Sequence, residues 1–257
     1  MNLLVVLAAI LFILMTLIGG KKGAKSFLAI FFNFAVLLLI ILLMTDPNLD
    51  PVILTMVACI LISCITLFFI NEFNSKTTIA FLSTLITIVI LLFFIVIVNN
   101  IAMIQGFGEE EIEELSSYSL KMGIDFVKIG ASVIIMSTIG AIVDVAISIA
   151  SPMREIYLHN PAISRKNLYK AGISIGKDIL GTSANTLFFA FFGSYLGLLI
   201  WFKDLSYSLG EIVNSKIFNA EMITILWAGI GVALNIPITA WITAAFLVKK
   251  KTTQEDQ

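Results

Sequence analysis

One aspartate lies inside an otherwise uncharged apolar stretch of the chain. Asp144 belongs to Ile129–Ala150, which reads IGASVIIMSTIGAIVDVAISIA and is long enough to cross a lipid bilayer. A carboxylate near the centre of a membrane helix costs roughly 2.5–3.5 kcal/mol on insertion scales. Because an apolar environment favours the protonated form of a carboxyl group, Asp144 is a candidate for taking up and releasing a proton within a membrane.

Small and polar residues accompany Asp144 at helical spacing. Steps of three or four residues connect Ser137, Gly140, Asp144, Ser148 and Ser151. This spacing places all five residues on one face of a helix. A narrow polar face on an apolar membrane helix is expected to meet protein or water, not lipid.

The two later apolar segments carry polar groups of their own. Asn185 lies at the same expected depth as Asp144, about 9 Å from the membrane boundary at about 1.5 Å per residue. The hydroxyl residues Thr182 and Thr186 flank it, and the last segment contains Asn235. We predict that Asp144, Asn185 and one polar group of the last segment form a single cluster.

Proline and charged residues modify the surroundings of this expected cluster. Pro237 has no N–H to donate within its helix, so the last segment is expected to kink or open there. The basic groups nearest to Asp144 are Arg154 and Lys177, at the expected inner boundary beside Asp178. The sequence leaves open whether Lys177 reaches Asp144.

A purely structural interpretation stands beside the functional one. Hydroxyl and small residues in membrane helices often serve close helix packing, and asparagines often link helices by hydrogen bonds. That interpretation is the favoured one for the serines, the threonines, Asn185 and Asn235. For Asp144 it is the less favoured one, because a neutral residue would pack at lower cost.

The composition is that of an integral membrane protein. Of 257 residues, 59% are hydrophobic and 13% are charged, whereas soluble domains average about 45–50% and about 25%. We therefore predict an all-α, multi-pass helical bundle that forms one membrane domain over residues 1–257. The sparse charges form no basic stripe for nucleic acid.

No cofactor, metal site or enzyme is expected from the sequence. His159 is the single histidine, Cys59 and Cys64 lie five residues apart in an apolar run, and CxxC and HExxH motifs are absent. An intramembrane aspartyl protease needs two membrane carboxylates, and the apolar segments offer only Asp144.

Seven apolar segments approach or exceed the length that a spanning helix requires, which is about 17–25 residues. They run approximately over Leu3–Ile18, Phe27–Met44, Val52–Ile70, Thr78–Val98, Phe126–Ala150, Leu180–Phe202 and Met222–Val248. Of the 16 lysines and arginines, 12 fall in the connections on one side or in the C-terminal tail. Because basic residues favour the cytoplasmic side, we predict an outer N-terminus and an inner C-terminus.

Several segments outside the spans have distinct expected roles. Residues 1–100 are expected to form four helices in hairpins, and residues 249–257 a cytoplasmic tail. The outer loop 101–122 contains EEEIEEL, which is either a solvated face or a negative mouth that attracts cations. In the inner loop, apolar residues at helical spacing predict an amphipathic surface helix over about residues 164–177, with Ser164 as its N-cap.

Three runs within Lys121–Val248 resemble the YibE/F family of bacterial membrane proteins. They read GAIVDVAISIASPMREIYLHNP, LYKAGISIGKDILGTSANTLFFAFFGSYLGLLI and WAGIGVALNIPITAWITAAF. Lys177 departs from the family, which commonly has arginine there. Charge is kept, but bidentate binding of an anion is lost.

The resemblance implies a bacterial cytoplasmic membrane protein but supplies no established biochemical activity. The last three spans are also distantly similar to one half of RND-type permeases such as SecF, in which an intramembrane acidic residue belongs to a proton relay. This chain lacks their large extracellular domain and the acidic pair that many of them have. Only Asp144 matches the relay position.

Two hypotheses from different classes follow. The first is a permease-like subunit, proton-coupled through Asp144, which needs a second copy or a paralogous YibE/F subunit to complete a pathway. The second is a membrane scaffold or regulatory subunit that holds a partner through the inner loop Ser151–Lys177. The sequence names neither a substrate nor a direction of transport.

Overall fold

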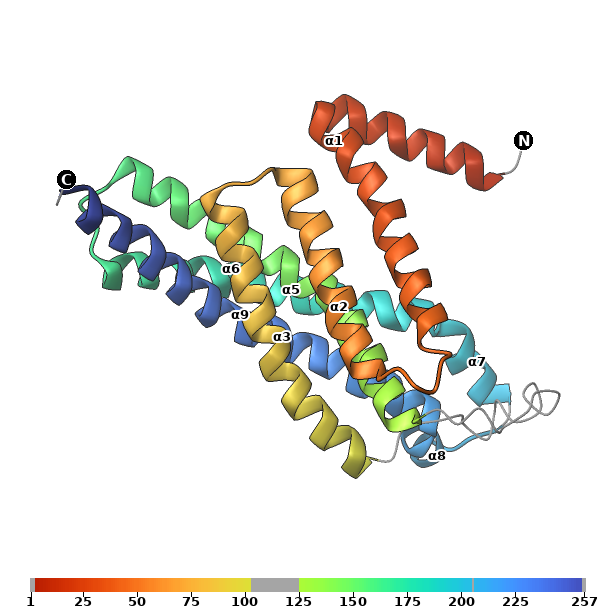
Figure 1. Ribbon diagram of the computed structural model, residues 1–257. Coiled ribbons are helices and arrows are strands. Elements are labelled where there is room, and N and C mark those ends of the chain that lie inside the picture. Colours follow the sequence, from red (N-terminus) through yellow and green to blue (C-terminus); the bar gives the residue numbers. More distant parts are fainter. Residues whose placement is uncertain (1–2, 103–124, 205, 256–257) are drawn as a thin grey trace.

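The computed structural model describes residues 3–102, 125–204 and 206–255 of the chain. All secondary structure in these ranges is helical, which confirms the all-α fold class (Figure 1). In chain order the helices are α1 (Leu3–Leu43), α2 (Pro51–Cys64) with its π-helical continuation η1 (Ile65–Phe69), α3 (Ser75–Ala102), α5 (Phe126–His159), α6 (Arg165–Ser194), α7 (Leu196–Asp204), α8 (Leu209–Asn214) and α9 (Lys216–Glu255).

The bundle is built around α5 and α9, which pack against each other. Both helices also pack against α3 and α6, and α5 packs against α2 as well. Apolar side chains of α3, α5 and α9 fill the main core, which includes Leu91, Ile142 and Val232. The second half of α1 lies beside α2, and its first half projects away from the bundle (Figure 1).

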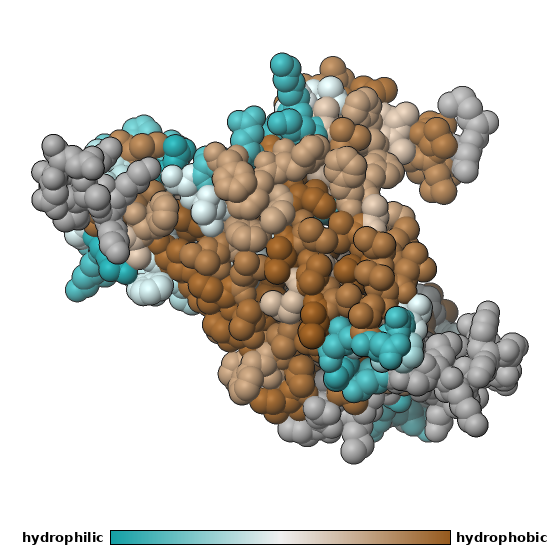
Figure 2. All heavy atoms as spheres, viewed as in Figure 1, coloured by the Kyte–Doolittle hydropathy of each residue, from teal (hydrophilic) through white to brown (hydrophobic). Residues whose placement is uncertain are grey.

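The surface matches a chain that lies in a lipid bilayer. Figure 2 shows a broad hydrophobic region across the middle of the molecule, with hydrophilic groups gathered toward its ends. Within the described ranges, five helices are long and apolar enough to cross a membrane, or six if the bent pair α6 and α7 counts as one span. The chain is therefore a multi-pass membrane protein.

The expected count of seven spans is not confirmed. Counted as one element, α1 is one of the five helices that could cross a membrane. The first two predicted segments lie in its two helical halves, which are joined by a sharp, non-helical kink at Gly20, where φ is +56° and ψ is −137°. Only glycine adopts this left-handed conformation at little cost. Close by, a Cβ on Gly23 would lie 1.8 Å from the Met15 carbonyl oxygen, so the two halves of α1 approach tightly at this elbow.

Two predicted segments at the Arg154 end of the bundle differ in the structure. The amphipathic helix expected over about residues 164–177 is the first part of α6 and continues without a break into the sixth predicted span. Ser164 precedes it as expected, and its Oγ accepts from the Asn167 N–H at 3.3 Å. Residues of the expected tail 249–257 continue α9 as far as Glu255. The acidic loop 101–122 falls almost entirely outside the described residues.

Candidate functional site

Asp144 lies on the surface of this chain, not in its core. Ser137, Gly140 and Asp144 are all exposed, and Ser148 is half-buried. A Cβ on Gly140 would meet nothing within 4 Å. The five-residue face predicted from spacing is therefore a real face of α5, and its central part is left uncovered by the rest of the described chain.

The position of Asp144 follows from helix geometry. Ile142 contacts Gly231 of α9, since a Cβ on that glycine would lie 3.2 Å from Ile142 Cδ1. Two residues further, at about 100° each, Asp144 lies almost opposite to Ile142 on the helix. Within the described part of the chain, no hydrogen bond or ion pair reaches its carboxylate.

The polar residues of α6 also face outward. Thr182, Asn185 and Thr186 are exposed. The two hydroxyls donate within their own helix, from Thr182 to the Ile179 carbonyl and from Thr186 to the Thr182 carbonyl, both at 2.9 Å. Hydroxyl groups bonded in this way are compatible with a lipid-facing, a protein-facing or a water-lined surface.

Glycine packing explains why Asn185 is exposed. A Cβ on Gly172 would lie 2.8 Å from Ala240 Cβ, and one on Gly176 would lie 2.2 Å from Ile236 Cγ2, both of α9. These glycines, four residues apart, form the face of α6 that approaches α9. Asn185 follows Gly176 by nine residues, which places it about 180° around the helix. The Gly172–Gly176 spacing was readable in the sequence, but the expectation of a separate surface helix obscured it.

Asn235 forms a buried hydrogen-bonded cluster of a different composition from the one expected. Its Nδ2 donates to the Ile142 carbonyl of α5 at 2.7 Å. Its Oδ1 accepts from Thr87 Oγ1 of α3 at 3.0 Å and from Thr239 Oγ1 at 3.1 Å. Asn235, Thr87 and Thr239 are fully buried. Among the described residues, no hydrogen bond joins Asn235 to Asp144 or Asn185, so Asn235 does not form the predicted three-residue cluster with them.

The remaining predicted positions lie near the membrane boundary or within α9. Arg154 is half-buried and its Nη1 lies 3.8 Å from Glu155 Oε1, whereas Lys177 and Asp178 are exposed and lack ion pairs with any described residue. None of these groups reaches Asp144. Pro237 lies inside α9, which continues through it as one helix, so the expected opening is not found.

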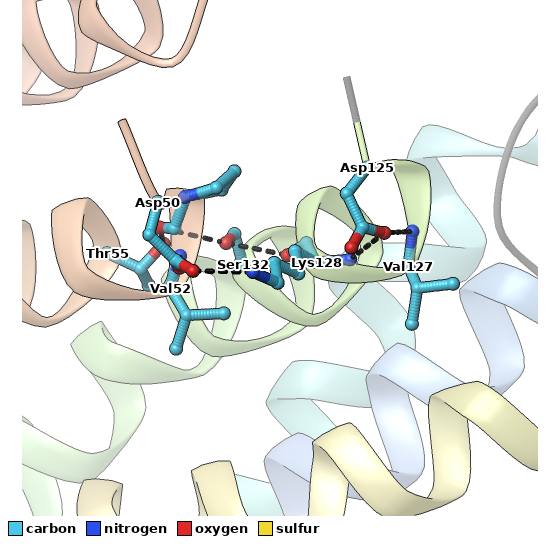
Figure 3. Close-up of polar contacts among 8 residues, drawn as sticks. Asp50, Val52, Thr55, Asp125, Val127, Lys128 and Ser132 are labelled. Carbon is cyan, nitrogen blue, oxygen red and sulfur yellow. Dashed lines mark hydrogen bonds and ion pairs between the residues drawn. The ribbon is translucent and has the colours of Figure 1, made fainter. Parts of the chain in front are cut away.

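A group of polar contacts between the start of α2 and the start of α5, at the end of the bundle away from Arg154, was not predicted from the sequence (Figure 3). Asp50 caps the start of α2 by accepting from the Val52 N–H at 2.9 Å, and its other oxygen pairs with Lys128 Nζ of α5. Ser132 Oγ donates to the Pro51 carbonyl at 3.2 Å. Both helix starts carry aspartate caps, a signal that the sequence offered, but nothing local indicated that residues 78 positions apart meet.

The ion pair between Asp50 and Lys128 makes a pH-dependent contribution to stability. The Lys128 hydrogen bond holds the pKa of Asp50 below its usual 3.8. A carboxyl group whose pKa is lower in the folded state than in the unfolded state stabilises the fold at pH values above its unfolded-state pKa. This stabilisation is lost as the pH falls through the folded-state pKa.

We expect Asp50→Asn, which keeps a capping oxygen, to lower the free energy of unfolding by about 0.2–1 kcal/mol at pH 7. Thermal unfolding should show this difference shrink as the pH falls below 3.8 and the Asp50 carboxylate becomes protonated. A difference of unchanged size at that acidity would contradict an ion-pair origin.

Comparison with known proteins gives one match. A family model described as "YibE/F-like protein" matches residues 7–249. The match includes the N-terminal helices, which carried no recognisable motif, as well as the three motif runs. No curated protein and no solved structure matches the chain.

Proposed function

The chain belongs to the YibE/F-like family, and on that premise we propose that it is a permease-like subunit of the bacterial cytoplasmic membrane, proton-coupled through Asp144. The observation that carries this proposal is the exposed carboxylate of Asp144, in a membrane-spanning helix and without a partner in the described chain. A carboxylate in direct contact with lipid tails is unfavourable. Water in a pathway, or a polar group of another subunit, is therefore expected to meet it.

The surroundings of Asp144 support a surface that a second subunit completes. Gly140 has open space above its Cα, and Gly181, Gly193 and Gly197 of the α6–α7 segment have open space too. Small residues on membrane helices allow other helices to approach closely. The expected partner is a second copy or a paralogous YibE/F subunit, with Asp144 between the two.

We expect Asp144→Asn to abolish proton coupling, because asparagine keeps the shape of the side chain but carries no exchangeable acid proton. The protein is purified and reconstituted into lipid vesicles that contain a pH-sensitive dye. Proton uptake into these vesicles should be observed with the natural protein and should fall in the variant.

Matched variants separate this role from a general charge effect. Asp204→Asn removes an exposed aspartate at the end of α7 and should leave the proton uptake unchanged. Asp144→Glu, which keeps a carboxyl group, should retain proton uptake. If the natural protein and Asp144→Asn give the same uptake, the proton role is refuted.

The scaffold hypothesis has one observation in its favour. The first turns of α6 expose Arg165, Lys166 and Lys170, which form a cationic surface suited to an acidic partner. If this surface carries the function, its replacement by glutamines should abolish the cellular phenotype, while Asp144→Asn should leave it intact. The opposite pattern would favour the permease.

A further inference from the structure

A groove separates α1 from the Lys128 half of α5. Its volume is about 610 Å³, which is within the range of about 300–1,000 Å³ typical of ligand pockets. A small apolar core lies beside the groove, in which Ile129 and Met136 of α5 pack near Ile40 of α1 and Met44 of the turn that follows α1. The walls are mainly apolar, formed by Leu37, Ile41, Met44, Ile129, Val133 and Met136.

A charged hollow adjoins this groove at the end of the bundle. It has a volume of about 180 Å³ and shares Met44 with the groove as a lining residue. Its charged lining consists of Asp46, Asp50, Asp125 and Lys128. Since Lys128 pairs with Asp50, the carboxylates of Asp46 and Asp125 have no ion pair among the residues described.

The apolar groove and the charged hollow lie next to each other, and together they fit one class of ligand. An apolar trough in a membrane-spanning region, ending in a hollow with excess negative charge, is complementary to an amphiphile with an acyl chain and a cationic head. A helix is about 10–12 Å wide, so a groove of about 610 Å³ would hold little more than one of its turns. The volume thus favours an acyl chain over a helix of a second copy.

We propose that the α1–α5 groove binds a phospholipid with an amine in its headgroup, with one acyl chain along Leu37 and Val133 and the ammonium beside Asp46 and Asp125. Asp46 already accepts from Asn48 N and Nδ2 through Oδ1, and Asp125 accepts from the Val127 and Lys128 N–H groups through Oδ1. Among the residues that the structure describes, no group donates to the Oδ2 atom of either carboxylate, and these two oxygens are the ones proposed to accept from the ammonium. Charge-assisted hydrogen bonds of this kind are the stronger class.

The full-length protein in detergent is incubated with equal amounts of phosphatidylethanolamine and phosphatidylglycerol, and retained lipid is counted by native mass spectrometry. We expect phosphatidylethanolamine to be retained in preference. Val133→Trp, which fills the groove from a side chain that is 54% exposed, should reduce its retention about tenfold. Val89→Trp, at a position on α3 that is 55% exposed, is the matched control and should have no effect.

The headgroup contact has its own variant. Asp46→Asn keeps the side-chain oxygen that accepts from Asn48 but removes the charge, and should lower the preference for phosphatidylethanolamine about fivefold. Equal retention in the natural protein and Val133→Trp, or a preference for the anionic lipid, would overturn the proposal. Asp144→Asn should retain lipid normally, so lipid binding and the proton role can fail independently of one another.

Discussion

Replacing Gly176 with leucine is expected to separate α6 from α9 and to lower the free energy of unfolding by at least about 2 kcal/mol. Even a single added carbon would lie 2.2 Å from Ile236 Cγ2, closer than two carbon atoms can approach. Neither helix can yield easily, because Gly172 is held against Met153 and Ala240 one turn earlier. The leucine must therefore force the two backbones apart.

Gly181→Leu provides the matched control for this effect. It makes the same change on the same helix, where a Cβ meets nothing within 4 Å. Since leucine also has a higher helix propensity than glycine, by up to about 1 kcal/mol, the control should be neutral or slightly stabilising. Unfolding in mixed detergent micelles, followed by circular dichroism, measures both variants. Equal midpoints for the two would mean that the α6–α9 contact contributes nothing to stability.

Asn235→Asp is expected to have the largest effect of any isosteric substitution in the chain. At neutral pH it replaces an N–H donor with a carboxylate oxygen, opposite the Ile142 carbonyl that the natural Nδ2 reaches at 2.7 Å. A buried charge without a compensating partner costs about 3–5 kcal/mol. We expect the variant to lose most of its stability at pH 7.

The pH dependence of this variant identifies the cause. A protonated carboxyl group can donate to the Ile142 carbonyl as the amide does, so the loss of stability should shrink as the pH falls. Asn185→Asp, on the exposed face of α6, makes the same change where no hydrogen bond is broken in the described chain and should cost much less. A loss for Asn235→Asp that is independent of pH would indicate a packing defect instead of a misplaced charge.

Much of the fold could be predicted because membrane helices are specified by local composition. The apolar segments from Val52 onward are helical except for a break at Tyr195, where α6 ends and the bent α7 begins. Ser164 marks the start of α6, and the polar residues of α5 share one face. These features depend on residues within one or a few turns of each other. The first two apolar segments likewise lie in the two halves of α1, but the three lysines between them resemble a loop and gave no sign that the connection is a sharp kink at Gly20.

The candidate site was less accessible to prediction because it depends on the rotation of each helix. Spacing along the sequence placed Asp144 on a polar face, but not the direction of that face. The direction is set by contacts that involve other helices, such as Gly176 with Ile236 and Ile142 with Asn235. Hydrogen bonds to Thr87, 148 residues from Asn235, have no local signature at all.

The unbroken course of α6 has a mechanical consequence. At about 1.5 Å per residue, its 30 residues form a rod about 45 Å long. Arg165 and Lys166 lie at one end, Thr186 lies beyond the middle, and the contact of Gly172 and Gly176 with α9 lies between them. The cationic end and the polar end therefore belong to one continuous helix, which is held against α9 between them. A partner bound at the cationic end would thus contact the same rigid element that carries the polar residues.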